Sequence, residues 1–248
     1  MNVLVHGACG KMGAEVLKCL AEMQGVTLLC GVDAMKKGDT PFPCYTSFDE
    51  VEGVPDVVVD FSFHTLVPSV LEYAVRVGCA AVIATTGLNE AELASVREAA
   101  KRIPVFYSAN MSVGIALLVD FAKRAAAAFP KADIEIVEAH HNRKVDAPSG
   151  TALMLAEGIR EVREHATLVT GRHGEGKRTQ GEIGIHALRM ANIVGEHEVL
   201  LTTDTQQLCL KHTAYGRGLF AEGAVKAACF VAGRASGLYN MYDMLYSE

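Results

Sequence analysis

Residues 140–151, with the sequence HHNRKVDAPSGT, place two adjacent histidines and two cations directly before a helix-start pattern. Histidine titrates near neutral pH, so either His140 or His141 can act as an acid while the other binds a ligand. Lys144 supplies a positive charge, and Arg143 adds another. This combination fits a metal site, a phosphate-binding site, or proton donors beside a bound carboxylate. It also fits a capped helix whose cations are merely solvated.

The end of the same stretch predicts the first turn of a helix. Asp146 or Ser149 can cap it, Pro148 suits an entry position, and the apolar stripe of TALMLAEGI follows. The free N–H groups of such a helix end attract carboxylates and phosphates. The helix start is therefore a candidate anion-binding site.

A metal site is the least favoured of these possibilities. Adjacent histidines on a strand point to opposite faces, and the sequence has no HxxxH pattern or second acid-histidine cluster. We expect no metal ion. His140, His141 and Lys144 then remain as proton donors and charge partners for a small anionic substrate.

A glycine-rich turn near the start of the chain provides a separate phosphate-binding site. Gly7, Gly10 and Gly13 lie between an apolar run and a helical pattern, which is the context of a dinucleotide-binding turn. Their spacing is GxxGxxG rather than GxGxxG, so the motif needs further support. Asp33 provides it, because it ends the next apolar run about 20 residues beyond Gly13, where a carboxylate can bind ribose hydroxyls.

Asp33 favours NAD over NADP, since a carboxylate repels a 2′-phosphate. Lys36 and Lys37 are close enough in sequence to reduce that repulsion, and Lys11 can reach a phosphate. All three lysines can equally be ordinary solvated residues. The sequence therefore leaves both NADH and NADPH open.

Apolar runs and helical patterns alternate through the first part of the chain. Continuous apolar strands joined by helices are typical of a parallel, doubly wound, Rossmann-type sheet. The loops after its later strands line the cofactor crevice, and here they supply Thr85, Thr86, Ala109 and Asn110. The expected strands are 2–6, 27–33, 56–61, 80–85 and 103–108, and the expected helices are 11–23, 65–78 and 89–102.

The pattern changes after this part. Later apolar runs follow one another with short turns, which predicts an antiparallel or mixed sheet in a second, α+β domain. A closing helix of about 14 residues, interrupted near its start by Gly223, fits either domain, and 171–184 is typical of a mobile loop. The other expected helices are 112–129 and 151–164, and the expected strands are 132–140, 184–193, 197–204 and 206–214.

Composition limits the partners and the compartment. The chain has 23 Lys and Arg against 29 Asp and Glu, a net charge of −6 without charged tails, which argues against a nucleic-acid or anionic-membrane partner. Its seven cysteines include no CxxC pair, as expected of free thiols in a reducing cytosol. No apolar run approaches the ~20 residues that span a bilayer, and no signal-peptide pattern is present. We expect a cytoplasmic protein.

The stretch EAHHNRKVDAPSGTA closely resembles the signature of the 4-hydroxy-tetrahydrodipicolinate reductase (dihydrodipicolinate reductase) family. The resemblance continues through GACGKMG, DFS, TTG, ANMSVG, IGIHALR, IVGEHEV and SGLYNMYDML, and so covers nearly the whole chain. Family members use NADH or NADPH to reduce 4-hydroxy-tetrahydrodipicolinate, by way of dihydrodipicolinate, to tetrahydrodipicolinate in lysine and diaminopimelate biosynthesis. The resemblance implies the same reaction here, on a small dicarboxylate substrate, in a homotetramer.

The resemblance also implies domain limits and site residues. It places a dinucleotide-binding domain at 1–111 and 219–248, and a substrate-binding and oligomerisation domain at 112–218. It makes His140 and Lys144 catalytic. The substrate-binding positions fall on His141, Lys144, Ser149, Gly150 and Thr151. The cofactor-binding positions fall on Gly7, Ala8, Cys9, Gly10, Lys11, Met12, Gly13, Asp33, Ala84, Thr85, Thr86, Ser108, Ala109, Asn110 and Met111.

The chain departs from the family pattern at Ala84, where GTTG is usual, and at Ala34, where members that prefer NADPH often carry arginine. The first change preserves a backbone contact, and the second leaves the cofactor preference open. Two rival interpretations are another Rossmann reductase of amino-dicarboxylates, such as an aspartate dehydrogenase, and a nucleotide-sensing protein without activity. The HHxxKxDAPSGT block argues against the first, and the presence of both His140 and Lys144 argues against the second.

Overall fold

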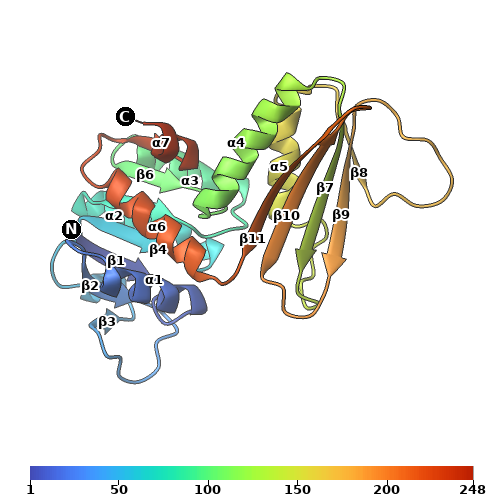
Figure 1. Cartoon of the computed structure of the whole chain (residues 1–248). Coiled ribbons are helices and arrows are strands. Elements are labelled where there is room, and N and C mark those ends of the chain that lie inside the picture. Colours follow the sequence, from blue (N-terminus) through green and yellow to red (C-terminus); the bar gives the residue numbers. More distant parts are fainter. Residues whose placement is uncertain (248) are drawn as a thin grey trace. The chain divides into compact units, whose positions relative to one another are not determined.

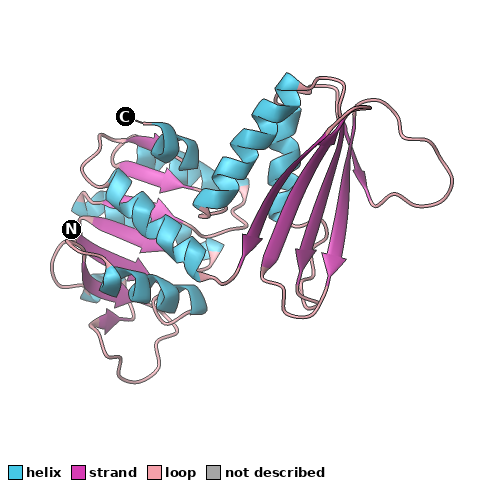
Figure 2. Cartoon of the chain, in the orientation of Figure 1, coloured by secondary structure: helices cyan, strands magenta, loops and turns pink. Residues whose placement is uncertain are grey.

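The computed structural model describes residues 1–247 as two compact units (Figure 1). One unit combines Met1–Ser112 with the segment from Arg217 onward, and the other is the continuous segment Val113–Gly216. Each unit contains one β-sheet, shown in magenta in Figure 2. The predicted α/β class, with a Rossmann-type sheet and a second, mixed sheet, is confirmed. Among residues 1–247, no helix is long and apolar enough to cross a bilayer.

The first unit is built on a seven-stranded parallel sheet in the order β12-β6-β5-β4-β1-β2-β3. The central strands β4 and β5 are buried along their whole length, because both faces of the sheet are covered. Their sequences, VVVD and AAVI, are accordingly apolar at nearly every position. The strands are β1 (Asn2–His6), β2 (Thr27–Val32), β3 (Cys44–Tyr45), β4 (Val57–Asp60), β5 (Ala80–Ile83), β6 (Pro104–Tyr107) and β12 (Gly237–Tyr239).

Helices cover the two faces of this sheet in pairs. Helices α1 and α6 pack together on one face, and α2 and α3 pack together on the other (Figure 1). Adjacent residues of β6 divide between the layers, since Val105 joins the core under α2 whereas Phe106 meets Phe230 of α6 edge to face. The helices are α1 (Lys11–Glu22), α2 (Val67–Val77), α3 (Glu90–Ala100), α6 (Gly218–Val231) and α7 (Met241–Tyr246), with short 3₁₀ turns η1 (Phe48–Glu50) and η2 (His64–Leu66).

The strand order reverses between β1 and β4. Successive strands β1, β2 and β3 extend one way from β1, and β4, β5 and β6 extend the other way. A parallel sheet binds its ligand outside the carboxyl ends of the strands at such a switch point. His6 and Asp60 end the two strands there, and the glycine turn follows His6 directly.

The second unit is a five-stranded mixed sheet in the order β11-β10-β7-β9-β8. The β10–β11 and β7–β10 pairs are antiparallel, whereas β7–β9 and β8–β9 are parallel. Helices α4 and α5 pack on one face and enclose an apolar core (Figure 1). The elements are α4 (Val113–Ala128), β7 (Asp133–His140), α5 (Gly150–Arg160), β8 (Thr167–Thr170), β9 (Glu182–Arg189), β10 (Gly195–Thr202) and β11 (Gln207–Ala214).

Several elements differ from the sequence prediction. The helix expected over 151–164 ends at Arg160, and the strand expected over 184–193 runs from Glu182 to Arg189. Gly223 does not interrupt α6 but lies buried inside it. Strands β3, β8 and β12 and helix α7 were not predicted, because each is short. The three strands form by pairing with β2, β9 and β6, which the sequence pattern does not show.

Candidate active site

Of the predicted catalytic residues, His140 is the last residue of β7 and Lys144 is in the loop after it. Ile134 and Ile136 on this strand belong to the apolar core, and the next residues on the same face are Glu138 and His140. Both polar side chains are buried. The strand therefore passes from an apolar environment to a polar one within one face.

Glu138 is a fully buried carboxylate with four hydrogen-bond donors. Its Oε2 accepts hydrogen bonds from His140 Nδ1 at 2.6 Å and from Arg189 Nη1 at 2.8 Å. Its Oε1 accepts from Arg189 Nη2 at 2.9 Å and from the Ser149 N–H at 3.0 Å. Strand pairing brings these groups together, since His140 lies opposite Arg189 of β9.

Burial by itself would raise the pKa of Glu138, but hydrogen bonds from Arg189, His140 and the Ser149 N–H outweigh it and lower that pKa. In return, the hydrogen bonds to Glu138 raise the pKa of Arg189. Glu138 is therefore ionised at neutral pH and can only accept hydrogen bonds. His140 must donate through Nδ1, which leaves Nε2 for proton exchange with a ligand.

The space beside His140 Nε2 is kept open by Gly195. A Cβ at this position would lie 3.1 Å from that nitrogen, closer than an ordinary contact. Gly195 is the first residue of β10, and the sequence analysis did not single it out. An unsubstituted backbone at this point gives the reactive nitrogen of His140 room for a ligand.

Ser149 connects the start of α5 to this cluster. Its Oγ caps the helix by accepting a hydrogen bond from the Ala152 N–H at 3.2 Å, and it contacts His197 Nε2 at 3.1 Å. Burial, with the nearby charge of His140, lowers the pKa of His197 to about 4. His197 is therefore neutral at pH 7. The residues after Ser149 at the helix start are exposed (Gly150) or partly exposed (Thr151).

Lys144 lies in the loop between β7 and α5, where its Nζ pairs with Asp146 Oδ1 at 2.8 Å. This contact lowers the pKa of Asp146. Ser149 and not Asp146 caps α5, which decides between the two candidates.

Arg143 donates to Asn142 and Asn192, so it has neutral partners in this structure. The His141 carbonyl accepts a hydrogen bond from the Lys144 N–H at 3.1 Å.

The glycine turn in the first unit has the geometry of a phosphate-binding turn. Gly7 has a φ of +79°, and a Cβ there would lie 2.8 Å from the Phe61 carbonyl oxygen. A Cβ at Gly13 would lie 2.3 Å from the Gly7 oxygen. Helix α1 begins at Lys11 without a side-chain cap and without an acidic residue in its first turn. Its first N–H groups therefore suit a pyrophosphate, and the turn fits a dinucleotide.

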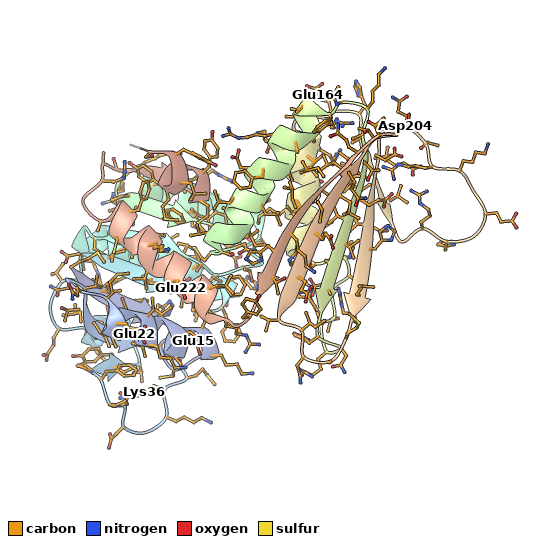
Figure 3. All side chains as sticks on the ribbon, in the orientation of Figure 1. Glu15, Glu22, Lys36, Glu164, Asp204 and Glu222 are labelled. Carbon is orange, nitrogen blue, oxygen red and sulfur yellow. The ribbon has the colours of Figure 1, made fainter. Side chains whose placement is uncertain are left out.

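Asp33 directly follows β2, and its carboxylate links the glycine turn to the turn after β2. Its carboxylate accepts hydrogen bonds from the Cys9 N–H at 2.9 Å and from the Met35 N–H at 2.8 Å. Each oxygen keeps a further lone pair for a ribose hydroxyl. Lys36 lies in the next loop (Figure 3), where its N–H donates to the Asp33 carbonyl oxygen.

A second buried carboxylate, Asp60, links the ends of three strands of the first unit. It accepts hydrogen bonds from His6 Nδ1 at 2.7 Å, Ser62 Oγ at 2.6 Å and Thr85 Oγ at 2.7 Å, and so joins the ends of β1, β4 and β5. The hydroxyl of Thr85 is thus used inside the protein. Its neighbours are the buried Ala84 and the exposed Thr86.

The predicted cofactor segment 108–111 forms a tight turn after β6. Ser108 Oγ donates to the Asn110 carbonyl oxygen at 2.7 Å, and Met111 is fully buried. Gly223 of α6 lies against this turn, because a Cβ there would be 1.7 Å from the Met111 oxygen. The glycine inside α6 therefore permits a close approach of helix and turn.

Five residues of these clusters were not predicted from the sequence: Glu138, Arg189 and His197 of the second unit, and His6 and Asp60 of the first. A signal existed for Glu138, which stands two positions before His140 on one strand and so shares its face. Arg189 and His197 belong to strands whose register only the fold defines. In residues 1–247, no group of three His, Cys, Asp or Glu side chains is arranged to hold a metal ion.

Family models and relatives of known function match almost the whole chain. The family model described as dihydrodipicolinate reductase, N-terminus, matches residues 1–111, and the model of its C-terminus matches residues 114–245. The 4-hydroxy-tetrahydrodipicolinate reductase of Caldanaerobacter subterraneus subsp. tengcongensis is 45% identical over 99% of this chain and 98% of its own length. That of Clostridium novyi is 41% identical over 100% and 99%.

A solved structure is similar as well. The dipicolinate-bound dihydrodipicolinate reductase from Paenisporosarcina sp. TG-14 has 26% sequence identity and a TM-score of 0.81. The match covers 97% of each chain. Sequence and fold comparisons therefore point to one family.

Proposed function

The chain belongs to the dihydrodipicolinate reductase family, and from that premise we propose which of its residues carry out the reaction. The reaction is the NADH- or NADPH-dependent reduction of 4-hydroxy-tetrahydrodipicolinate, by way of dihydrodipicolinate, to tetrahydrodipicolinate in lysine and diaminopimelate biosynthesis. The reduced nicotinamide supplies a hydride when it is bound. The substrate is a small dicarboxylate, in keeping with the dipicolinate-bound relative.

His140 and Lys144 are the proposed catalytic residues, and the His140–Glu138 hydrogen bond is the observation that carries the proposal. Reduction of the conjugated imine places negative charge on the substrate, which a proton must neutralise. Glu138 accepts the Nδ1–H hydrogen bond of His140, so the proton that His140 gives to the substrate is the Nε2 proton of its imidazolium form, on the side of Gly195. Arg189 compensates the charge of Glu138 and keeps that carboxylate in place.

The proposed substrate-binding residues surround the start of α5 and are His141, Lys144, Ser149, Gly150 and Thr151. Lys144 already holds a carboxylate, that of Asp146 at 2.8 Å. A carboxylate of the substrate presents the same group, so it can share or replace this contact. No acidic residue in the first turn of α5 competes for the helix N–H groups. These two features account for recognition of a dicarboxylate.

The proposed cofactor-binding residues are those of the glycine turn, the ribose acid and the loops after β5 and β6. The tight backbone approach at Gly7 and Gly13 and the uncapped start of α1 support this assignment. The full set of proposed cofactor-binding residues is Gly7, Ala8, Cys9, Gly10, Lys11, Met12, Gly13, Asp33, Ala84, Thr85, Thr86, Ser108, Ala109, Asn110 and Met111. Accordingly we propose that 1–111 and 219–248 bind the cofactor, and that 112–218 bind the substrate and form the oligomer.

We propose further that the protein is a cytoplasmic homotetramer, assembled through the sheet face opposite α4 and α5. That face carries the Glu196–Lys211 ion pair, and its Leu188 is 43% exposed. The tetramer is what the family resemblance implies, and a partner subunit on this face would cover the exposed Leu188. A single-chain molar mass by light scattering would contradict the tetramer.

The test is an assay of NADH and NADPH oxidation, side by side, with freshly generated dihydrodipicolinate. We expect Lys144→Ala to lower kcat by about 10²–10⁴-fold, the usual contribution of general acid catalysis, and to weaken substrate binding. Its affinity for NADH should be unchanged, since Lys144 is not part of the proposed cofactor site. Wild-type turnover in this variant would contradict the assignment.

A further inference from the structure

Two cysteines meet at the glycine turn of the first unit. Cys9 is in the turn after β1, and Cys44 is the first residue of β3 at the edge of the same sheet. Their sulfur atoms are 4.0 Å apart. The two residues are distant in sequence, so the fold alone creates this pair.

The surroundings explain why the thiols can approach. Gly31 of β2 pairs with Cys44, and a Cβ at Gly31 would lie 2.6 Å from the Ala8 Cβ and 3.2 Å from Cys44 Sγ. A side chain at this position would thus separate the turn from β3. Cys9 is exposed, whereas Cys44 is only 7% exposed. One thiol of the pair is therefore open to reagents and the other is enclosed behind it.

From this geometry we propose that Cys9 and Cys44 are a modification site, a dithiol that low-molecular-weight disulfides oxidise to an intramolecular disulfide, and that this bond weakens cofactor binding at the turn. The effect on the cofactor rests on the proposed function of the glycine turn. The disulfide itself does not depend on it.

The chemistry is a pair of thiol–disulfide exchanges with oxidised glutathione. The Cys9 thiolate attacks one glutathione sulfur, forms a mixed disulfide and releases one reduced glutathione. Cys44 then attacks the Cys9 sulfur, the Cys9–Cys44 bond forms, and the second glutathione leaves. Two protein thiols are oxidised, one glutathione disulfide is reduced to two thiols, and the thiol protons end on the released glutathione.

The second exchange should be the slower one. Burial, with the neighbouring Cys9, raises the pKa of Cys44 to about 11, and of the nearby charged groups Lys36 opposes this shift while Asp33 adds to it. Little thiolate is present at neutral pH, and thiolate is the attacking species. The mixed disulfide on Cys9 should therefore accumulate first and convert faster as the pH rises toward 11.

We expect closure of the bond to disturb the cofactor turn. A disulfide needs a sulfur–sulfur distance of about 2.0 Å, so the two sulfurs have to approach from their present 4.0 Å. The backbone N–H of Cys9 donates to Asp33 Oδ2 at 2.9 Å. This hydrogen bond holds the glycine turn against Asp33, the carboxylate proposed to bind the ribose. A shift of Cys9 toward β3 strains that hydrogen bond at the point where a dinucleotide is expected.

The experiment treats the full-length protein with oxidised glutathione, alkylates the remaining thiols, and maps disulfides by peptide mass spectrometry. We expect a Cys9–Cys44 cross-linked peptide in the wild type and in the control variant Cys229→Ser, which removes an exposed cysteine of α6. In Cys44→Ser, Cys9 should stop at the mixed disulfide. NADH affinity of the cross-linked protein should fall on the order of tenfold and return after reduction with dithiothreitol.

Two results would overturn the proposal. One is that Cys44 stays fully alkylatable in the wild type after prolonged oxidation at raised pH, since then no disulfide forms. The other is a cross-linked protein that binds NADH as tightly as the reduced one. Failure of the proposed function can be distinguished from failure of the disulfide proposal. If the glycine turn does not bind the cofactor, neither the reduced wild type nor reduced Cys44→Ser would bind NADH. Saturating NADH should also lower the fraction of cross-linked protein at equilibrium in a glutathione redox buffer, since the coupling free energy between two sites is reciprocal.

Discussion

Glu138 binds His140, Arg189 and the start of α5 through one ionised carboxylate, so a neutral replacement of the same shape tests all these contacts together. In Glu138→Gln, the amide cannot accept every one of these hydrogen bonds, and the Arg189 charge loses its partner. We expect kcat to fall by about 10²-fold, with NADH affinity unchanged. Steady-state kinetics and NADH titration measure both quantities.

A matched control is Glu135→Gln on the same strand, because Glu135 faces the opposite side of the sheet and pairs with His186 and Arg178. A purely structural effect would lower the active fraction without changing the pH profile of kcat. A positioning effect should displace that profile, since His140 would no longer be held as its Nδ1–H form. An unchanged rate and profile in Glu138→Gln would exclude this role for Glu138.

His197 makes stability depend on pH. Its pKa is lowered from 6.5 to about 4 in the folded protein, so between these values the unfolded chain binds the extra proton. The contribution of neutral His197 is complete above about pH 6.5 and is lost as pH falls toward 4, amounting to about 3 kcal/mol. In His197→Gln we expect a smaller fall in thermal stability between pH 7 and about 4.5 than in the wild type. The control His173→Gln, at an exposed position, should behave as wild type. A pH dependence in His197→Gln equal to that of the wild type would contradict the lowered pKa of His197.

Residue types alone identified only part of this site. His140 and Lys144 stand in a recognisable motif, and Glu138 could have been found from its spacing to His140. Arg189 and His197 could not, because their proximity depends on the register of β9 and β10 against β7. A buried charge network is a property of strand pairing, which one sequence does not specify.

Helix α6 can pack as it does only because Gly223 has no side chain. Glycine inside a helix normally costs about 1 kcal/mol relative to alanine, so Gly223→Ala would stabilise an isolated helix. Here the added Cβ would lie 1.7 Å from the Met111 carbonyl oxygen. We expect Gly223→Ala to destabilise the protein by about 1–3 kcal/mol and to weaken NADH binding through the 108–111 turn.

Gly218→Ala is the matched control in the same helix, since its Cβ would meet nothing nearer than a Glu15 side-chain oxygen at 3.9 Å. It should leave thermal stability and NADH affinity near the wild-type values. Equal or greater stability of Gly223→Ala would show that α6 and the turn separate easily. Thermal unfolding and fluorescence titration with NADH decide between the two results.

Long elements were predictable because the spacing of their apolar residues shows which faces are buried. The apolar runs of β4 and β5 and the amphipathic helices between strands required no knowledge of partners. Short elements were not, since β3 has two residues and forms only by pairing with β2. The same limit hid the contact of Cys9 with Cys44, which exists because β3 lies beside β2 at the sheet edge.

At the scale of the whole molecule, the two units have separate cores and separate candidate sites. The first unit is discontinuous in sequence, because β12 returns to pair with β6, whereas the second is one continuous segment. The proposed dinucleotide site and the proposed dicarboxylate site are on different units, so each ligand would have its own binding elements. This division leads to a prediction about where each ligand protects the backbone.

Hydrogen–deuterium exchange with NADH alone and with dipicolinate alone should give two different protection patterns. NADH should protect the first turn of α1 and segments 84–86 and 108–111, because a bound dinucleotide would cover these segments and slow their local opening. Dipicolinate should protect the first turn of α5, where Ser149 and Glu138 already order the backbone around the helix start. Protection of the glycine turn by dipicolinate, without any at the start of α5, would reverse the assignment of ligands to units. A Lys144→Ala variant should lose most of the dipicolinate protection and retain that of NADH, which ties the second pattern to the carboxylate contact now made by Asp146.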